Sequence, residues 1–152
     1  MAFAFVVSFP RSGLSQVNSL LFGTWKLNLA KSVYQLGPPP TAQTQTYEPS
    51  GGGMKVSVET IAGNGARITY GYVAELDGKP YVMHGELTPN GAETIAIHSI
   101  DAFRSEAILR RGGEVVLTIR SVISQDGKTL TLTSRGTNLR EQPTNSVTVF
   151  DK

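Results

Sequence analysis

The feature of the sequence that most constrains the fold is a succession of ten short runs in which apolar and polar residues alternate, separated by turn residues. Alternation with a period of two places successive side chains on opposite faces of a β-strand. Val, Ile and Thr, which favour strands, make up 36 of the 152 residues. Ten short strands divided by turns are typical of a sandwich or a barrel, so the sequence predicts an all-β fold. The runs are Phe22–Asn28, Ala42–Glu48, Met54–Ile61, Ala66–Leu76, Lys79–His84, Thr94–Ser99, Ala102–Arg111, Glu114–Ser124, Lys128–Arg135 and Ser146–Phe150.

Two segments fall outside this pattern. Ala30–Leu36 is the best candidate for one helical turn, which the prolines at Pro38–Pro40 would end. Met1–Leu21 contains a short apolar run with no basic residue before it, so we expect a loose or packed arm, or a degenerate export signal. The rest of the chain, residues 22–152, is expected to form a single β-barrel domain. The sequence does not decide whether the protein is periplasmic, secreted or cytoplasmic.

Composition excludes several classes of protein. The absence of cysteine excludes disulfides, thiolate metal sites and a Cys nucleophile. The net charge is only +2 and the basic residues form no clustered stripe in the sequence, so we expect no nucleic-acid partner. No apolar stretch is long enough for a membrane span. We expect no cofactor and no metal, because His84 and His98 fall on the predicted outer face without a second ligand at close spacing. The expected assembly is a monomer or a weak homodimer.

Three glycine turns, at Asp77-Gly78, Gly112-Gly113 and Asp126-Gly127, fix the predicted register of the strands around them. Directly opposed residues in a hairpin share one face of the sheet. The last two turns then place one set on the inner face, namely Arg104, Glu106, Ile108, Leu117, Ile119, Ser121, Ile123, Leu130 and Leu132, and leave Ser105 and Ala107 outside.

The Asp77-Gly78 turn similarly groups Tyr70, Tyr72, Ala74, Tyr81 and Met83 on the inner face. Parity in the other strands points a further set inward: Trp25, Leu27, Met54, Val56, Val58, Ile95, Ile97, Val147 and Val149. A meander of this many strands protects its edges best by closing. We therefore predict an up-and-down antiparallel barrel of about 8–10 strands, whose interior is wide enough for one small ligand.

The strand at Phe22–Asn28, FGTWKLN, resembles the opening strand of the calycins, that is, the lipocalins and fatty-acid-binding proteins. Together with DGKTLTLTSRGTN and the ending VTVFDK, it is similar to small bacterial lipocalin-like proteins of unassigned function, over Phe22 to Lys152. The resemblance implies a lipocalin-like barrel in which an arginine of a late strand, Arg120 or Arg135, packs across Trp25.

The sequence departs from the fatty-acid-binding pattern in two places. That family carries Arg-x-Tyr in its last strand to hold a carboxylate, whereas Ser146–Phe150 reads SVTVF. It also has a helical pair between its first two strands, and Ala30–Pro40 is too short for one. The resemblance therefore does not imply a fatty acid held in that family's way.

Arg104 and Glu106 are the sharpest chemical feature of the predicted interior. Two residues apart on one strand, they point the same way, and a buried charge must pair, reach water or meet a ligand. One interpretation is that the two residues bind a polar group of a ligand. The alternatives are an ion pair between them inside the barrel, or an error in the predicted register that leaves both in solvent. The predicted ligand-binding set is Trp25, Tyr70, Tyr72, Tyr81, Met83, Ile97, Arg104, Glu106, Leu117, Ile119 and Ser121.

The leading hypothesis for function is the binding of a small, largely hydrophobic molecule inside the barrel. The first alternative is a barrel isomerase or cyclase in which Glu106 and Tyr72 act as acid and base. The second is a non-catalytic envelope protein whose barrel is filled by side chains. An internal cavity separates the first two from the third, and proton exchange at a bound ligand separates the enzyme from the binding protein.

Overall fold

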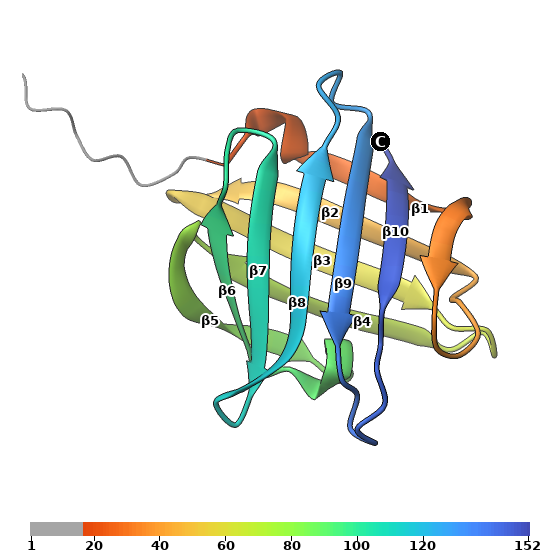
Figure 1. The fold of residues 1–152 in the computed structure, drawn as a ribbon. Coiled ribbons are helices and arrows are strands. Elements are labelled where there is room, and N and C mark those ends of the chain that lie inside the picture. Colours follow the sequence, from red (N-terminus) through yellow and green to blue (C-terminus); the bar gives the residue numbers. More distant parts are fainter. Residues whose placement is uncertain (1–16) are drawn as a thin grey trace, which may run out of the picture.

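The computed structural model describes residues 17–152, which form a closed barrel of ten antiparallel strands (Figure 1). Each strand pairs with its neighbours along the chain, and β1 pairs with β10, so the meander closes on itself. The ten predicted runs correspond to the ten strands, which confirms the all-β, up-and-down barrel. The strands are β1 (Gly23–Tyr34), β2 (Ala42–Ser50), β3 (Gly53–Ile61), β4 (Arg67–Ala74), β5 (Asp77–Gly85), β6 (Thr94–Ser99), β7 (Arg104–Arg111), β8 (Glu114–Ile123), β9 (Thr129–Gly136) and β10 (Ser146–Asp151).

The connections between strands alternate between the two ends of the barrel, because every neighbouring pair is antiparallel. One end, which we call the Trp25 end, carries the short 3₁₀-helix η1 (Ser19–Leu21), the β6–β7 connection and the C-terminus (Figure 1). The opposite end carries a second 3₁₀-helix, η2 (Pro89–Gly91), between β5 and β6. Residues 1–16, which contain most of the predicted arm or export signal, lie outside the described residues.

Trp25 anchors its end of the barrel. Its side chain is fully buried, and its Nε1–H donates to the carbonyl oxygen of Leu21 in η1 at 2.8 Å. Helix η1 is held in turn by Asn18, whose Nδ2 donates to the carbonyl oxygen of Ala102 at 2.7 Å. The resemblance implied a late-strand arginine over the indole ring, but the cation there is Lys152, with Nζ 5.0 Å from the ring centroid.

The register of β7 against β8 differs from the prediction because β8 contains a bulge. Next to the Gly112-Gly113 turn, Arg110 pairs with Val115 as expected for a two-residue loop, but beyond it Leu109 pairs with Leu117. Val116 is the extra residue, and its carbonyl oxygen accepts from the backbone N–H of Thr137 and from Asn90 Nδ2, each at 3.0 Å. Because β8 keeps its predicted inward face beyond the bulge, the one-residue shift changes which residues of β7 lie opposite it.

The bulge needs a glycine opposite it. A Cβ atom on Gly136 would lie 2.1 Å from the carbonyl oxygen of Val116, closer than any side chain can come. Leu117 pairs with Gly136, so β9 approaches the bulged strand closely at this point. The glycine therefore permits the change of register.

The consequence is that β7 presents the opposite face to the one predicted. Ala107 and Leu109 are buried. Arg104 makes an ion pair with Asp101, and Glu106 makes one with Arg120, and both arginine side chains are more than half exposed. Removing two charges from water costs several kcal/mol per ion. The bulge avoids that cost, and the predicted register is wrong here: Glu106 pairs with Arg120 on the outer face, and Arg104 is half exposed at the Trp25 end.

Three smaller predictions are also corrected. In β10, Thr148 and Phe150 point inward rather than Val147 and Val149, because Phe150 lies opposite Leu27 on β1 and Leu130 on β9. Ala30–Leu36 is not a helical turn. Instead, β1 runs through most of it as an irregular strand, in which Ser32 Oγ accepts from the backbone N–H of Val149 at 2.9 Å.

The third correction is that Asp77-Gly78 belongs to a strand, β5, and not to a tight turn between two paired strands. Tyr72 pairs with Met83 and Tyr70 with Gly85, which is the predicted register. The ladder between β4 and β5 extends no closer to the turn than Tyr72 and Met83, however, and Asp77 is the first residue of β5, where it pairs with His98 of β6. The inward grouping of Tyr70, Tyr72 and Met83 is unaffected by this difference.

Replacing Trp25 with alanine is expected to lower the free energy of unfolding by about 3–5 kcal/mol, the usual cost of removing a buried aromatic side chain. Urea unfolding followed by circular dichroism measures the change. Val33→Ala is the control, because Val33 is 65% exposed and its truncation should cost less than about 0.5 kcal/mol. A Trp25→Ala midpoint equal to that of the wild type would show that Trp25 does not anchor the barrel.

Candidate functional site

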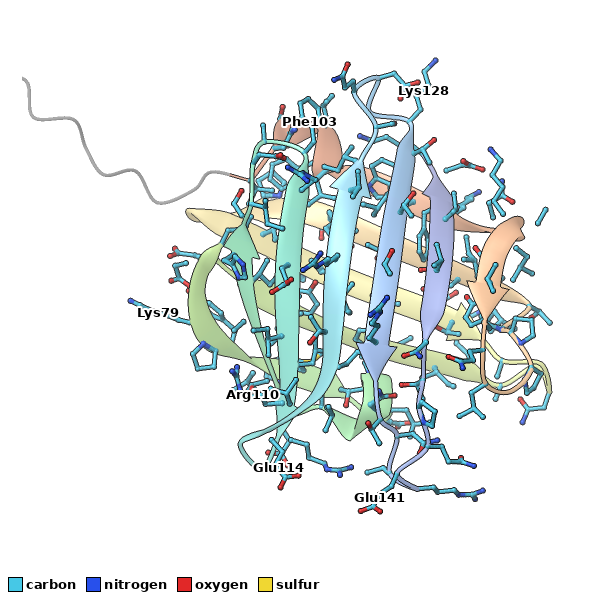
Figure 2. The ribbon with its side chains drawn as sticks, viewed as in Figure 1. Lys79, Phe103, Arg110, Glu114, Lys128 and Glu141 are labelled. Atoms are coloured by element: carbon cyan, nitrogen blue, oxygen red, sulfur yellow. The ribbon has the colours of Figure 1, made fainter. Side chains whose placement is uncertain are left out.

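The candidate site is a cavity of about 90 Å³ that follows the barrel interior from the Trp25 end toward the opposite end. Val17, Asn18 and Phe103 line it at the Trp25 end, and Pro89 of η2 lines it at the other. Figure 2 shows Phe103 beside η1, on the β6–β7 connection. The wall is mainly apolar, as expected of a barrel interior, but one side of it carries a cluster of polar groups.

The polar side of the wall is built by two rows of residues that cross β2 to β5. In the first row Tyr47 lies opposite Val56, Val56 opposite Tyr72, and Tyr72 opposite Met83. In the second row, which is two residues along each strand, the order is Gln45, Val58, Tyr70 and Gly85. Directly opposed residues share a face, so strand pairing brings the three phenol groups to one side of the cavity.

Gly85 allows β5 to approach β4 closely beside Tyr70. A Cβ atom at this position would lie 2.5 Å from the carbonyl oxygen of Thr69 and 2.7 Å from Tyr70 Cβ, and the φ angle of Gly85 is +139°. A larger residue would push the two strands apart at the tyrosines.

Tyr47 begins a chain of buried hydrogen bonds. Its hydroxyl donates to Gln45 Oε1 at 2.7 Å, and Gln45 Nε2 donates to Gln43 Oε1 at 3.1 Å. Gln43 Nε2 then donates to Thr60 Oγ1 at 2.8 Å. Tyr47 and Gln45 are both buried, and the chain fixes their orientation because each buried polar group needs a partner.

The hydroxyls of Tyr70 and Tyr72 differ from that of Tyr47, because neither of them makes a hydrogen bond within residues 17–152. Both residues line the cavity. Burial raises the pKa of Tyr47, Tyr70 and Tyr72 well above the ordinary value near 10, and the neighbouring phenols raise the pKa of Tyr72 further. At neutral pH all three are therefore uncharged, and two of them have an O–H group free to donate into the cavity.

The opposite side of the cavity is formed by β6 to β9 and is largely aliphatic. Ile97, Ala107 and Leu109 come from β6 and β7, and Ile119 and Ser121 come from β8. Ala107 and Ser121 are small, so the cavity persists between the aliphatic side chains and the tyrosines.

An ion pair lies where the cavity meets the Trp25 end. Arg104 Nη2 lies 2.7 Å from Asp101 Oδ2, and Arg104 Nε donates to the same oxygen at 2.8 Å. Asp101 also accepts from the backbone N–H groups of Phe103 and Arg104. The hydrogen bond from the Arg104 side chain, followed by these backbone bonds, holds the pKa of the Asp101 carboxyl below its ordinary value. The pair is about half exposed to solvent, so it lies at the rim.

The structure brings together seven of the eleven predicted ligand-binding residues. Trp25 and Leu117 are buried in the core outside the cavity wall, and the hydroxyl of Tyr81 donates to Asp77 Oδ2 at 2.6 Å. Glu106 is on the outer surface. The residues in the wall are Tyr70, Tyr72, Met83, Ile97, Arg104, Ile119 and Ser121, of which Arg104 is at the rim.

Glu106 lies outside the barrel wall. Its carboxylate accepts from Arg120 Nε at 3.0 Å, and its other oxygen is 4.0 Å from His98 Nε2. Tyr72 points to the inside of the wall, so the alternative acid–base pair of Glu106 and Tyr72 is not assembled. The bulge in β8 is the reason for this correction.

Sequence reasoning missed Gln45, Tyr47, Ala107 and Leu109, which all line the cavity. For Gln45 and Tyr47 a usable pattern was present, since Gln43, Gln45 and Tyr47 alternate with threonines along one strand. Their polar character at inward positions is the feature that would have marked them. Ala107 and Leu109 were missed because the bulge was not foreseen.

Comparison with known proteins adds no family assignment: no protein-family model matches the chain, and a search of curated proteins finds no significant match. Between residues 17 and 152 no helix is long and apolar enough to cross a membrane. The same part of the chain contains no group of three His, Asp or Glu side chains placed to hold a metal ion.

Glu106→Gln is expected to change the free energy of unfolding by less than about 1 kcal/mol, because its pair with the largely exposed Arg120 is a surface ion pair. Glu59→Gln, which breaks the more exposed pair with Arg67, is the reference for a fully solvated pair and should cost no more than Glu106→Gln. Chemical denaturation measures both. A loss of about 3 kcal/mol or more for Glu106→Gln alone would instead indicate a buried pair.

The cavity tyrosines should make stability fall at alkaline pH. Below about pH 10 they are neutral in both states, and above it the unfolded chain releases their protons while the native state retains them. Each such group lowers the free energy of unfolding by about 1.4 kcal/mol per pH unit in this window. Urea unfolding between about pH 9 and 11.5 should therefore show a shallower fall for Tyr70→Phe than for the wild type. Equal slopes would contradict the burial of Tyr70.

Proposed function

We propose that the protein binds a small, largely apolar molecule inside the barrel. The observation that carries the proposal is the cavity of about 90 Å³, with its apolar wall and its tyrosine cluster. A water molecule needs only about 10–15 Å³ of such space, so the interior is larger than a single trapped water requires. A barrel filled by its own side chains would not leave it.

The proposal includes a lipocalin-like assignment for the barrel. Its support is the Gly-x-Trp sequence at the start of β1, with Gly23 and Trp25 at the end where η1 packs. The closed ten-stranded meander is compatible with that assignment. In barrels of this size the interior commonly holds one small ligand.

The cavity is smaller than the roughly 300–1,000 Å³ of most ligand pockets, so binding must enlarge it. Met54 and Met83 line the wall, and methionine side chains change rotamer easily. Phe103 lies at the Trp25 end on a connection rather than a strand. Movement of these side chains supplies space without breaking the strand pairing of the barrel.

The expected affinity is modest. Burial of about 300 Å² of apolar ligand surface contributes roughly 7–8 kcal/mol at about 25 cal/mol per Å². The loss of translational and rotational freedom offsets a large part of that. We therefore expect dissociation constants in the micromolar range for a simple apolar probe, with polar contacts deciding between ligands.

The test is a fluorescence titration with N-phenyl-1-naphthylamine, a neutral apolar dye. The wild type should bind it with roughly micromolar affinity. Ala107→Leu and Ser121→Leu fill the cavity from its aliphatic side and should weaken binding at least tenfold. Ala42→Leu adds the same kind of side chain at an exposed position of β2 and should leave binding unchanged.

Circular dichroism and urea unfolding show whether each variant keeps the barrel. Absence of dye binding to the folded wild type would overturn the proposal and favour a filled barrel. Equal binding to the wild type and to both folded cavity variants would place the dye elsewhere, which also contradicts the proposal.

A further inference from the structure

The cavity combines two free hydrogen-bond donors with an absence of charge deep inside, and this combination restricts the ligand. The donors are the hydroxyls of Tyr70 and Tyr72, which lie two residues apart on β4 and face the cavity. Neither has a protein acceptor within residues 17–152. Among residues 17–152 the only enclosed side-chain polar atom without a partner is Arg111 Nη1, so the two tyrosine hydroxyls keep accessible surface and are open to a ligand oxygen or nitrogen with a lone pair.

The hydroxyl of the third tyrosine, Tyr47, already has an acceptor in the wall. Tyr47 donates to Gln45 Oε1, and Gln45 and Gln43 pass the chain on to Thr60. These bonds orient both glutamines toward Tyr47 and Thr60, and neither glutamine accepts a hydrogen bond from Tyr70 or Tyr72. Of the three phenols on this side of the cavity, Tyr70 and Tyr72 are thus the two whose O–H groups have no acceptor within residues 17–152.

No charged side chain among residues 17–152 lines the cavity except the rim pair, Asp101 and Arg104. An ionised ligand group placed among the tyrosines would have no counter-ion, and an unpaired buried charge is expensive. At the rim the Arg104 guanidinium already donates to Asp101 through two nitrogens, at 2.8 and 2.7 Å. The rim pair is neutral overall, and it lies at the half-exposed mouth of the cavity rather than among the tyrosines.

We infer that the ligand is an uncharged apolar molecule carrying a hydrogen-bond acceptor, such as a ketone, ester or amide, and that Tyr70 and Tyr72 bind the acceptor. Carboxylates, including fatty acids, and cationic amines are excluded from the same position. This inference rests on the proposed function, since it names the class of ligand for that cavity. The raised pKa of both tyrosines supports it, because the phenols remain donors at neutral and mildly alkaline pH.

Three probes of similar size and shape test the inference. Acetophenone has an apolar ring and a carbonyl acceptor, ethylbenzene lacks the acceptor, and benzoate carries a negative charge at pH 7.5. Binding of each is measured by displacement of N-phenyl-1-naphthylamine and by NMR titration of the protein. We expect acetophenone to bind about three- to tenfold more tightly than ethylbenzene, the range for a net hydrogen bond. Benzoate should bind at least tenfold more weakly than acetophenone.

The variant Tyr70→Phe/Tyr72→Phe removes both donors while keeping the rings. It should lose the preference for acetophenone and bind ethylbenzene at least as well as the wild type does. Tyr34→Phe is the matched control, because Tyr34 lies near the end of β1 outside the cavity wall, and it should keep the preference. Circular dichroism checks that all variants remain folded.

The outcomes separate the two proposals. If neither the dye nor any of the three probes binds the folded protein, the proposed function is wrong. If the dye binds but benzoate competes as well as acetophenone, or ethylbenzene does so, the function stands and this inference is overturned. If the preference for acetophenone survives in Tyr70→Phe/Tyr72→Phe, the tyrosines are not the donors and the inference is likewise overturned.

Discussion

The pairing of β1 with β10 is the interaction on which the rest of the structure depends. It joins the first and last strands, so all ten strands have a hydrogen-bonded neighbour on each side and the sheet has no open edge. Closure also divides every strand into one face inside the barrel and one face in solvent. The interior is then shared by all ten strands, and each inward position must satisfy the chemistry of a small enclosed space.

That enclosed space explains why β8 is bulged. Without the extra residue Val116, the two-residue turn at Gly112-Gly113 would carry Arg104 and Glu106 inside. With it, Glu106 meets Arg120 on the outer surface and Ala107 and Leu109 enter the core. The carbonyl of Val116 is satisfied by Thr137 and Asn90, and Gly136 leaves room for it. Electrostatic cost and local hydrogen bonding thus override the register that the turn alone would set.

The same enclosure gives the polar side of the cavity its character. Tyr47 and Gln45 are satisfied by a hydrogen-bond chain within the wall, whereas Tyr70 and Tyr72 face space that no protein acceptor fills. The two hydroxyls keep accessible surface beside the cavity, whereas Tyr47 is buried and hydrogen-bonded. The proposed ligand would supply the acceptor that these two donors lack within residues 17–152.

The alternation of residues by itself determined the ten strands, the meander and the inward placement of Trp25, Tyr70, Tyr72, Met83 and Ile97. These features follow from the period of the strand and from short turns, which are local properties of the chain. Only the tertiary structure decided the faces of β7 and β10, the role of Lys152 beside Trp25 and the hydrogen-bond chain from Tyr47. Each of these depends on residues far apart in sequence, such as Val116 with Asn90, or Trp25 with Lys152. The two-residue period of the sequence does not reveal a single inserted residue, because the bulge is stabilised by contacts that exist only after the barrel has closed.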